Sequence, residues 1–142
     1  MRILAVDLGD VRTGFAVCDR SEFLASPVGV VTERNRERLQ TVVLEKIRET
    51  GAEQVIVGNP INMDGSAGFR SQACTEFAAA LAEQTEVPVR LWDERATTVS
   101  AHNILSEVDV RGKKRKAVVD AVAAVVILES YLAWRKNHPD EV

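Results

Sequence analysis

The chain has 142 residues, of which 46% are hydrophobic and 27% are charged. This balance excludes an intrinsically disordered chain and predicts one domain, residues 1–142, with a buried core. The longest apolar run, Ala121–Leu128, is far shorter than the ~20 residues of a membrane-spanning helix. No secretory pattern opens the sequence, and both cysteines have apolar neighbours, so we expect a reduced cytoplasmic protein.

Three short strands are predicted at the start of the chain. Residues 3–6 (ILAV) form a buried strand that ends at Asp7, residues 14–18 begin a second strand, and residues 25–31 form a third. Pro27 favours an edge position for the third strand, because proline cannot donate to a neighbouring strand. The short turns between the three strands predict an antiparallel meander.

Strands and helices alternate in the rest of the chain. Gly51 ends the first of these helices, because glycine readily adopts the left-handed conformation that closes a helix. A meander followed by such alternation predicts an α/β fold with a five-stranded mixed sheet and helices on its faces. We predict helices over residues 38–49, 71–84 and 117–135, strands over residues 54–57 and 88–92, and a helix from Thr97 or Thr98 to Leu105.

Asp120 is the most informative single residue. It lies in AVVDAVAAVVIL, where every neighbour from 117 to 128 is apolar. A buried carboxylate without a partner is costly, so Asp120 needs a cation or a metal ion. A salt bridge to Arg12, Arg95 or one of the cations in residues 111–116 would meet this need as well as a metal would.

Asp7 and Glu94 each follow a predicted strand, and binding sites in open α/β sheets form at the carboxyl ends of strands. Taken singly, Asp7 is also typical of a turn and Glu94 of a solvated strand end. Together with Asp120 they provide the oxygen ligands that Mg²⁺ or Mn²⁺ prefers. Two such ions can stabilise the attacking and leaving oxygens of phosphodiester cleavage.

A basic segment offsets a net charge of −3, which by itself argues weakly against nucleic-acid binding. Residues 111–116 read RGKKRK, and all but one of them are cations. We place them in a loop before the last helix. Concentrated positive charge of this kind favours binding to a phosphate backbone.

Other chemistries find less support in the sequence. The DLGDVRTG turn resembles the first phosphate loop of the actin and sugar-kinase ATPases, but those proteins need two such domains and this chain provides one. His102 and His138 have no partner at ligand spacing, so a zinc site is not expected. The hydroxyl residues lack a nearby histidine, which argues against a nucleophilic triad. Trp92 and Trp134 are expected in the core or in an interface.

The chain resembles the YqgF (RuvX) family of pre-16S rRNA nucleases and Holliday-junction-resolvase-like proteins. The resemblance covers residues 2–135 and rests on four blocks in order: AVDLGDVRTGFAVCD, VIVGNPINMDGSAG, VRLWDERATTVSA and RGKKRKAVVDAVAAVVILESYL. It implies an RNase H-like fold in which Asp7, Glu94 and Asp120 are the catalytic, metal-binding acids. It also implies substrate contacts from Arg12, Gly58, Asn62, Asp64, Gly65, Arg95, Lys113, Lys114, Arg115 and Lys116.

The last helix departs from the pattern of related resolvases, which often carry two acids one turn apart. Positions 116, 117, 123 and 124 are Lys, Ala, Ala and Ala, so Asp120 has no acidic neighbour on its helix. A fourth ligand would then come from Asp93, a strand-end carbonyl or the substrate.

Three functions are consistent with these residues. The first is metal-dependent cleavage of structured RNA in ribosomal RNA maturation, with ribosomal precursors as partners. The second applies the same chemistry to branched DNA as a Holliday junction resolvase, and the third is a non-catalytic nucleic-acid-binding factor. Either a monomer or a homodimer is compatible with the sequence, and no membrane partner is expected.

Overall fold

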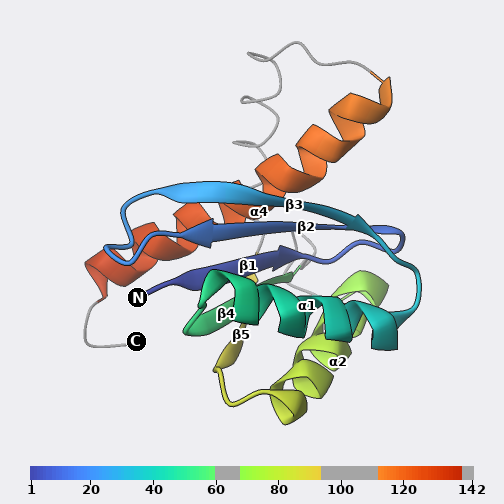
Figure 1. Ribbon diagram of the computed structural model, residues 1–142, viewed down its shortest axis with the longest axis horizontal. Coiled ribbons are helices and arrows are strands. Elements are labelled where there is room, and N and C mark those ends of the chain that lie inside the picture. Colours follow the sequence, from blue (N-terminus) through green and yellow to red (C-terminus); the bar gives the residue numbers. More distant parts are fainter. Residues whose placement is uncertain (60–67, 94–111, 139–142) are drawn as a thin grey trace.

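A computed structural model describes residues 1–59, 68–93 and 112–138, with backbone alone at residues 69–70 and 112–121. Its centre is a five-stranded sheet in the order β3-β2-β1-β4-β5 (Figure 1). The strands are β1 (Ile3–Asp7), β2 (Arg12–Cys18), β3 (Ala25–Thr32), β4 (Gln54–Asn59) and β5 (Val89–Asp93). The helices are α1 (Arg36–Thr50), α2 (Phe69–Gln84) and α4 (Gly112–Asn137).

The sheet is mixed, as the sequence predicts. β1, β2 and β3 pair antiparallel, whereas β4 lies parallel to β1 and β5 parallel to β4. β3 is an edge strand that carries Pro27, which confirms the expected meander and its edge. The predicted helix from Thr97 or Thr98 to Leu105 lies outside the described residues.

Side-chain alternation along β1 separates two hydrophobic clusters. Leu4 and Val6 belong to the cluster beneath α1 and α2, and Ile3 and Ala5 belong to the cluster beneath α4. This follows from the two-residue period of a strand, whose successive side chains point to opposite faces. The sheet is therefore covered on both faces, with α4 on one and α1 and α2 on the other (Figure 1).

The ends of α1 have clear local causes. The Asn35 side chain accepts a hydrogen bond from the backbone N–H of Arg38 at 3.0 Å and caps the first turn. Gly51 adopts a left-handed conformation with φ of 68° and ends the helix, as predicted. Between these ends the predicted apolar stripe, Leu39, Val43 and Ile47, is buried against the sheet.

The predicted loop is wrong for residues 112–116, because α4 already begins at Gly112 and includes Lys113 to Lys116, whereas Arg111 lies outside the described residues. Lysine and arginine are good helix formers, and the apolar helix that follows supplies a nucleus from which the preceding turns extend. The C-terminal half of α4 packs on β1, β2 and β3, where the Tyr131 hydroxyl donates to Gln54 at 3.1 Å. Within the described parts, no helix combines the length and apolar character needed to cross a membrane.

Candidate active site

The carboxyl ends of β1, β4 and β5 meet at one edge of the sheet. Val6 pairs with Val57, so Asp7 stands beside Gly58, and Asn59 pairs with Asp93 in β5. Asp7 is half-buried there. The three strand ends are neighbours at this edge, and ligands of open α/β sheets bind at the carboxyl ends of the strands.

The turn after Asp7 is tightly built. A Cβ atom at Gly9 would lie 2.0 Å from the carbonyl oxygen of Arg12, so only glycine fits this approach. The Gly9 N–H points to the hydroxyl of buried Thr13 at 3.5 Å. Arg36, the first residue of α1, donates to the Gly9 carbonyl at 2.9 Å and lies 3.6 Å from the Asp10 carboxylate.

Strand alternation assigns the described acids to different faces. Asp7 follows Ile3 and Ala5 in register and so belongs to the α4 face. Asp93 follows Leu91, which packs with the cluster beneath α1 and α2. Asp93 and Asp7 therefore occupy strand positions on opposite faces of the sheet. This disfavours the predicted alternative in which Asp93 supplies a fourth ligand beside Asp7.

The end of β4 is held by α2. The Ser71 hydroxyl, buried in the first turns of α2, donates to the Asn59 side-chain oxygen at 2.6 Å. Gly58 is buried and pairs with Trp92. This link fixes the backbone at which the GNPINMDGSAG loop leaves the sheet.

The structure describes only part of the predicted site. Asp7, Arg12 and Gly58 lie at or near the carboxyl edge, with Arg12 half-buried at the start of β2. Asp120 and the cations Lys113 to Lys116 belong to the part of α4 for which only the backbone is described. Glu94, Asn62, Asp64, Gly65 and Arg95 lie outside the described residues. Among the side chains that are described, no group of three possible metal ligands occurs, and that set lacks two of the three predicted acids.

Four residues that support this edge were not among the predicted site residues: Arg36, Thr13, Asn59 and Ser71. Arg36 is separated from Gly9 by 27 residues, and one sequence carries no signal for such a contact. The glycine of the turn did give a usable signal, because a DLG turn between two strands suggests a close backbone approach.

Comparison with known protein families identifies the family of this chain. A family model described as "RuvX: Holliday junction resolvase" matches residues 1–134. The chain belongs to the RuvX family. This confirms the resemblance found in the four sequence blocks.

Curated relatives agree with membership of the RuvX family. A protein of Lachnospira eligens is 41% identical over 140 residues, covering 96% of this chain and 100% of the relative. A protein of Halothermothrix orenii is 41% identical over 137 residues, covering 96% and 98%. Both carry the name "Putative pre-16S rRNA nuclease".

Solved structures show the fold of this RuvX chain. Thermus thermophilus RuvC superposes with a TM-score of 0.60 at 15% identity, covering 96% of this chain and 97% of RuvC. The fowlpox virus Holliday junction resolvase gives a TM-score of 0.56 at 15% identity, covering 94% and 99%. The predicted RNase H-like α/β fold is thereby confirmed.

Proposed function

We propose that this RuvX protein is a divalent-metal-dependent nuclease that hydrolyses phosphodiesters of structured RNA in the cytoplasm, in maturation of the 5′ end of pre-16S rRNA. The observation that supports it best is the position of Asp7. This acid ends the central strand, on the face that α4 covers, at the edge where three strand ends meet.

Glu94 is the second carboxylate of the proposed site. Arg90 and Trp92 precede it in β5 at intervals of two, and Trp92 packs with the cluster beneath α4. Glu94 lies outside the described residues, and the proposal rests on its place in the sequence, two residues after Trp92, whereas Asp93 follows Leu91 at the same interval. The proposal therefore favours Glu94, and not Asp93, as the second carboxylate.

Asp120 approaches the same edge along α4. The helix runs antiparallel to β1, because Arg135 near its C-terminal end contacts Glu22 beside the start of β1, while its first turns lie toward the other end of the sheet (Figure 1). Ala124 is buried with Ile3 and Ala5. Asp120 precedes Ala124 by one helical turn, toward the Asp7 end of the sheet.

Three carboxylates fit a hard cation such as Mg²⁺ or Mn²⁺, and the donor set contains no sulfur or imidazole that would favour zinc. When bound, the metal supplies an activated water and neutralises charge at the scissile phosphate. Asp7, Glu94 and Asp120 would hold it.

The other predicted residues would bind the substrate. Lys113, Lys114, Arg115 and Lys116 would hold the phosphate backbone, and Arg12, Arg95 and the GNPINMDGSAG loop would contact nucleotides near the cut. Such phosphate contacts position the substrate without reading its sequence.

Branched DNA is the second candidate substrate. The family description names Holliday junction resolution, and Thermus thermophilus RuvC has been solved with a Holliday junction substrate. The names of the curated relatives favour RNA. Binding without cleavage is the third candidate, and it draws on the absence of a second acid near Asp120 on α4.

Cleavage of matched substrates tests the proposal. The purified chain is incubated with a 5′-extended 16S rRNA fragment and with a four-way DNA junction, each with and without Mg²⁺ or Mn²⁺. We expect metal-dependent cutting of the RNA and a loss of about 10²-fold or more in Asp7→Asn, Glu94→Gln and Asp120→Asn. Asp10→Asn is the matched control, because Asp10 is 83% exposed in the same turn.

The outcomes separate the candidate functions. Exclusive junction cutting would replace RNA with branched DNA. Metal-independent binding without turnover on either substrate would identify a binding factor. Unchanged cleavage in Asp7→Asn and Asp120→Asn would refute the assignment of the site.

A further inference from the structure

A second feature lies at the opposite end of the sheet, in the turn that joins β2 to β3. The Asp19 carboxylate accepts hydrogen bonds from the backbone N–H groups of Phe23 at 2.8 Å and Leu24 at 3.1 Å, and from the Ser21 hydroxyl at 2.7 Å. The Asp19 N–H donates to the Leu24 carbonyl at 3.1 Å. These bonds fix the backbone of the turn.

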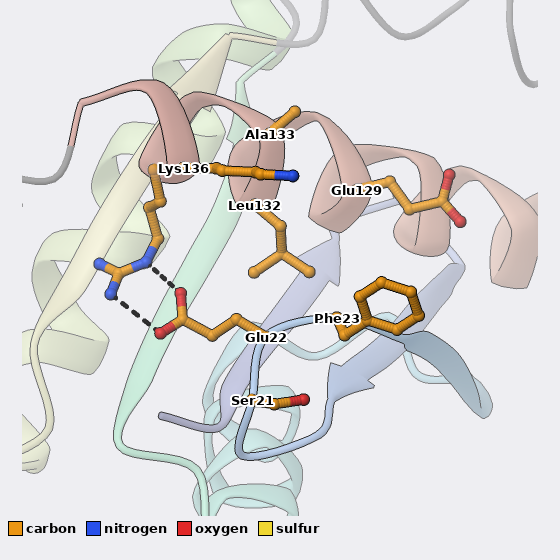
Figure 2. Close-up of a pocket in the computed structure, with 8 residues that line it drawn as sticks. Ser21, Glu22, Phe23, Glu129, Leu132, Ala133 and Lys136 are labelled. Carbon is orange, nitrogen blue, oxygen red and sulfur yellow. Dashed lines mark hydrogen bonds and ion pairs between the residues drawn. The ribbon is translucent and has the colours of Figure 1, made fainter.

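Glu22 ties the turn to the end of α4. It has a φ of 59°, which costs free energy in a residue other than glycine, so the surrounding contacts must hold it. Its carboxylate binds the Arg135 guanidinium through two hydrogen bonds (Figure 2). It also accepts a hydrogen bond from the N-terminal amine at 3.0 Å. The turn is therefore rigid with respect to α4.

This rigid turn exposes apolar surface. Among the described residues, Phe23 and Leu24 are the large hydrophobic side chains left open to solvent, 88% and 61% exposed. Water is an unfavourable environment for them, and a fixed apolar projection beside polar residues is typical of an interaction site.

A hollow of about 680 Å³ lies between the turn and α4. Leu132 points from α4 toward the turn, with Phe23 across from it, and Glu129 and Lys136 lie along the helix on either side (Figure 2). The hollow thus has an apolar middle, an acid toward one end and a cation toward the other.

The α4 wall has the spacing of a helix-packing stripe. Glu129, Leu132, Ala133 and Lys136 stand at positions i, i+3, i+4 and i+7, which lie on one side of a helix. Ala133 is small and exposed, so it permits close approach of another backbone. Glu129 and Lys136 are about 10 Å apart along the axis at 1.5 Å per residue.

We infer that this face binds a second copy of the chain, with the two α4 helices antiparallel across a two-fold axis. The axis would pass near Ala133, which is exposed, beside Leu132, which is 9% exposed and packs with the cluster beneath α4. Each Glu129 then lies opposite Lys136 of the second copy, and Phe23 and Leu24 cover the flank of the opposing helix. A two-fold contact requires such a self-complementary patch, and this stripe has opposite charges on either side of an apolar centre.

The charge order favours a second copy over an unrelated protein, because the stripe is its own electrostatic complement when reversed. The face also lies beside the start of β1, at the other end of that strand from Asp7, so the carboxyl edge stays open in the dimer. The proposal does not rest on the nuclease function. One stripe and one turn make a small interface, so association should depend on concentration.

Charge exchange tests this interface with the full-length chain. Sedimentation velocity is measured over a range of concentrations for wild type, Glu129→Lys, Lys136→Glu and the double variant. We expect each single variant to associate roughly tenfold more weakly or worse, because two attractive pairs become repulsive. The double variant, and an equimolar mixture of the two single variants, should recover association, because opposite charges face each other again.

Two further variants complete the test. Glu83→Lys makes the same charge change on an exposed position of α2 and should leave association unchanged. Phe23→Ser should weaken association while thermal unfolding shows an intact fold, and Glu22 and Arg135 stay untouched. A wild type that remains monomeric up to about 1 mM, or single variants whose mixture stays monomeric while wild type associates, would overturn the proposal.

Discussion

Arg36 donates a hydrogen bond from its guanidinium to the carbonyl oxygen of Gly9, two residues beyond Asp7, at 2.9 Å. The same guanidinium lies 3.6 Å from Asp10. Arg36 opens α1, whose buried stripe packs against the sheet. The helix on one face of the sheet therefore holds the turn that follows the central acid, and Asp7 on the other face depends on that turn for its position.

Replacing Arg36 with alanine should reduce cleavage more than it reduces stability. The lost bond to Gly9 is worth about 1 kcal/mol, and the exposed pair with Asp10 adds little. Because small displacements of catalytic groups have large kinetic effects, we expect kcat to fall about tenfold or more. Steady-state kinetics over a Mg²⁺ series and urea unfolding measure the two effects.

Arg38→Ala is the matched control, since Arg38 is exposed on the same helix. It should retain wild-type kcat. Equal kinetics for Arg36→Ala and Arg38→Ala would show that the turn holds Asp7 without this brace.

Gly9→Ala should damage the site directly. Its Cβ atom would lie 2.0 Å from the Arg12 carbonyl, so the turn must shift. We expect a loss of about 2 kcal/mol in the free energy of unfolding and loss of metal-dependent cleavage. Differential scanning calorimetry and the cleavage assay report the two changes.

Gly51→Ala provides the comparison. Gly51 also resists substitution, through its φ of 68°, but no atom lies within 4 Å of an added Cβ. We expect a loss of about 1 kcal/mol with cleavage retained. If Gly9→Ala behaved like Gly51→Ala, the close approach at Gly9 would have no functional role.

The strands, the antiparallel meander of the first three and the position of Asp7 at a strand end can be predicted from the sequence, because apolar runs and short turns are local signals. The carboxyl ends of β1, β4 and β5 lie at one edge of the sheet because these three strands are parallel. The start of α4 cannot be predicted as well, because five cations look like a loop until the apolar helix that supports them is considered. Long-range ties such as Arg36 to Gly9 or Glu22 to Arg135 join residues that no local pattern relates.

Glu22→Gln should change how stability depends on pH. The hydrogen bond from Arg135 is the main cause that lowers the pKa of Glu22, and the N-terminal amine lowers it further. A carboxyl with a lowered folded-state pKa stabilises the fold above its unfolded pKa, and this contribution is lost as pH falls through the folded pKa. The variant should therefore be less stable by about 1 kcal/mol at pH 7 and equal to wild type in strong acid.

Urea unfolding at a series of pH values measures this difference. Glu49→Gln is the control, because the Glu49 side chain is 63% exposed where it pairs with Lys46 at 3.6 Å, so its replacement should change stability little at any pH. A Glu22→Gln effect that stays constant from pH 7 into the acid range would contradict the charge-based account.

Tyr131→Phe should destabilise the fold without affecting cleavage. The hydroxyl donates to Gln54 at 3.1 Å, and both side chains are buried. Removing it leaves the Gln54 oxygen without this donor, so we expect a loss of about 1–2 kcal/mol. Gln54 begins β4, at the end of the sheet away from Asp7, so kcat should remain unchanged.

Thr41→Ala serves as its control, because it also removes a hydroxyl. The Thr41 hydroxyl donates to the Glu37 carbonyl at 3.3 Å on the exposed side of α1. A reduction of kcat in Tyr131→Phe at a temperature where it is fully folded would show that α4 transmits changes to the site.

The central claim is that Asp7, Glu94 and Asp120 meet at one metal site on the α4 face of the carboxyl edge. Anomalous diffraction from crystals soaked in Mn²⁺ tests it most directly. We predict a manganese peak within about 2–2.5 Å of carboxylate oxygens of these three acids, and its loss in Asp7→Asn. A peak bound by Asp93 instead, or no peak near Asp7 in crystals that bind manganese elsewhere, would contradict the account.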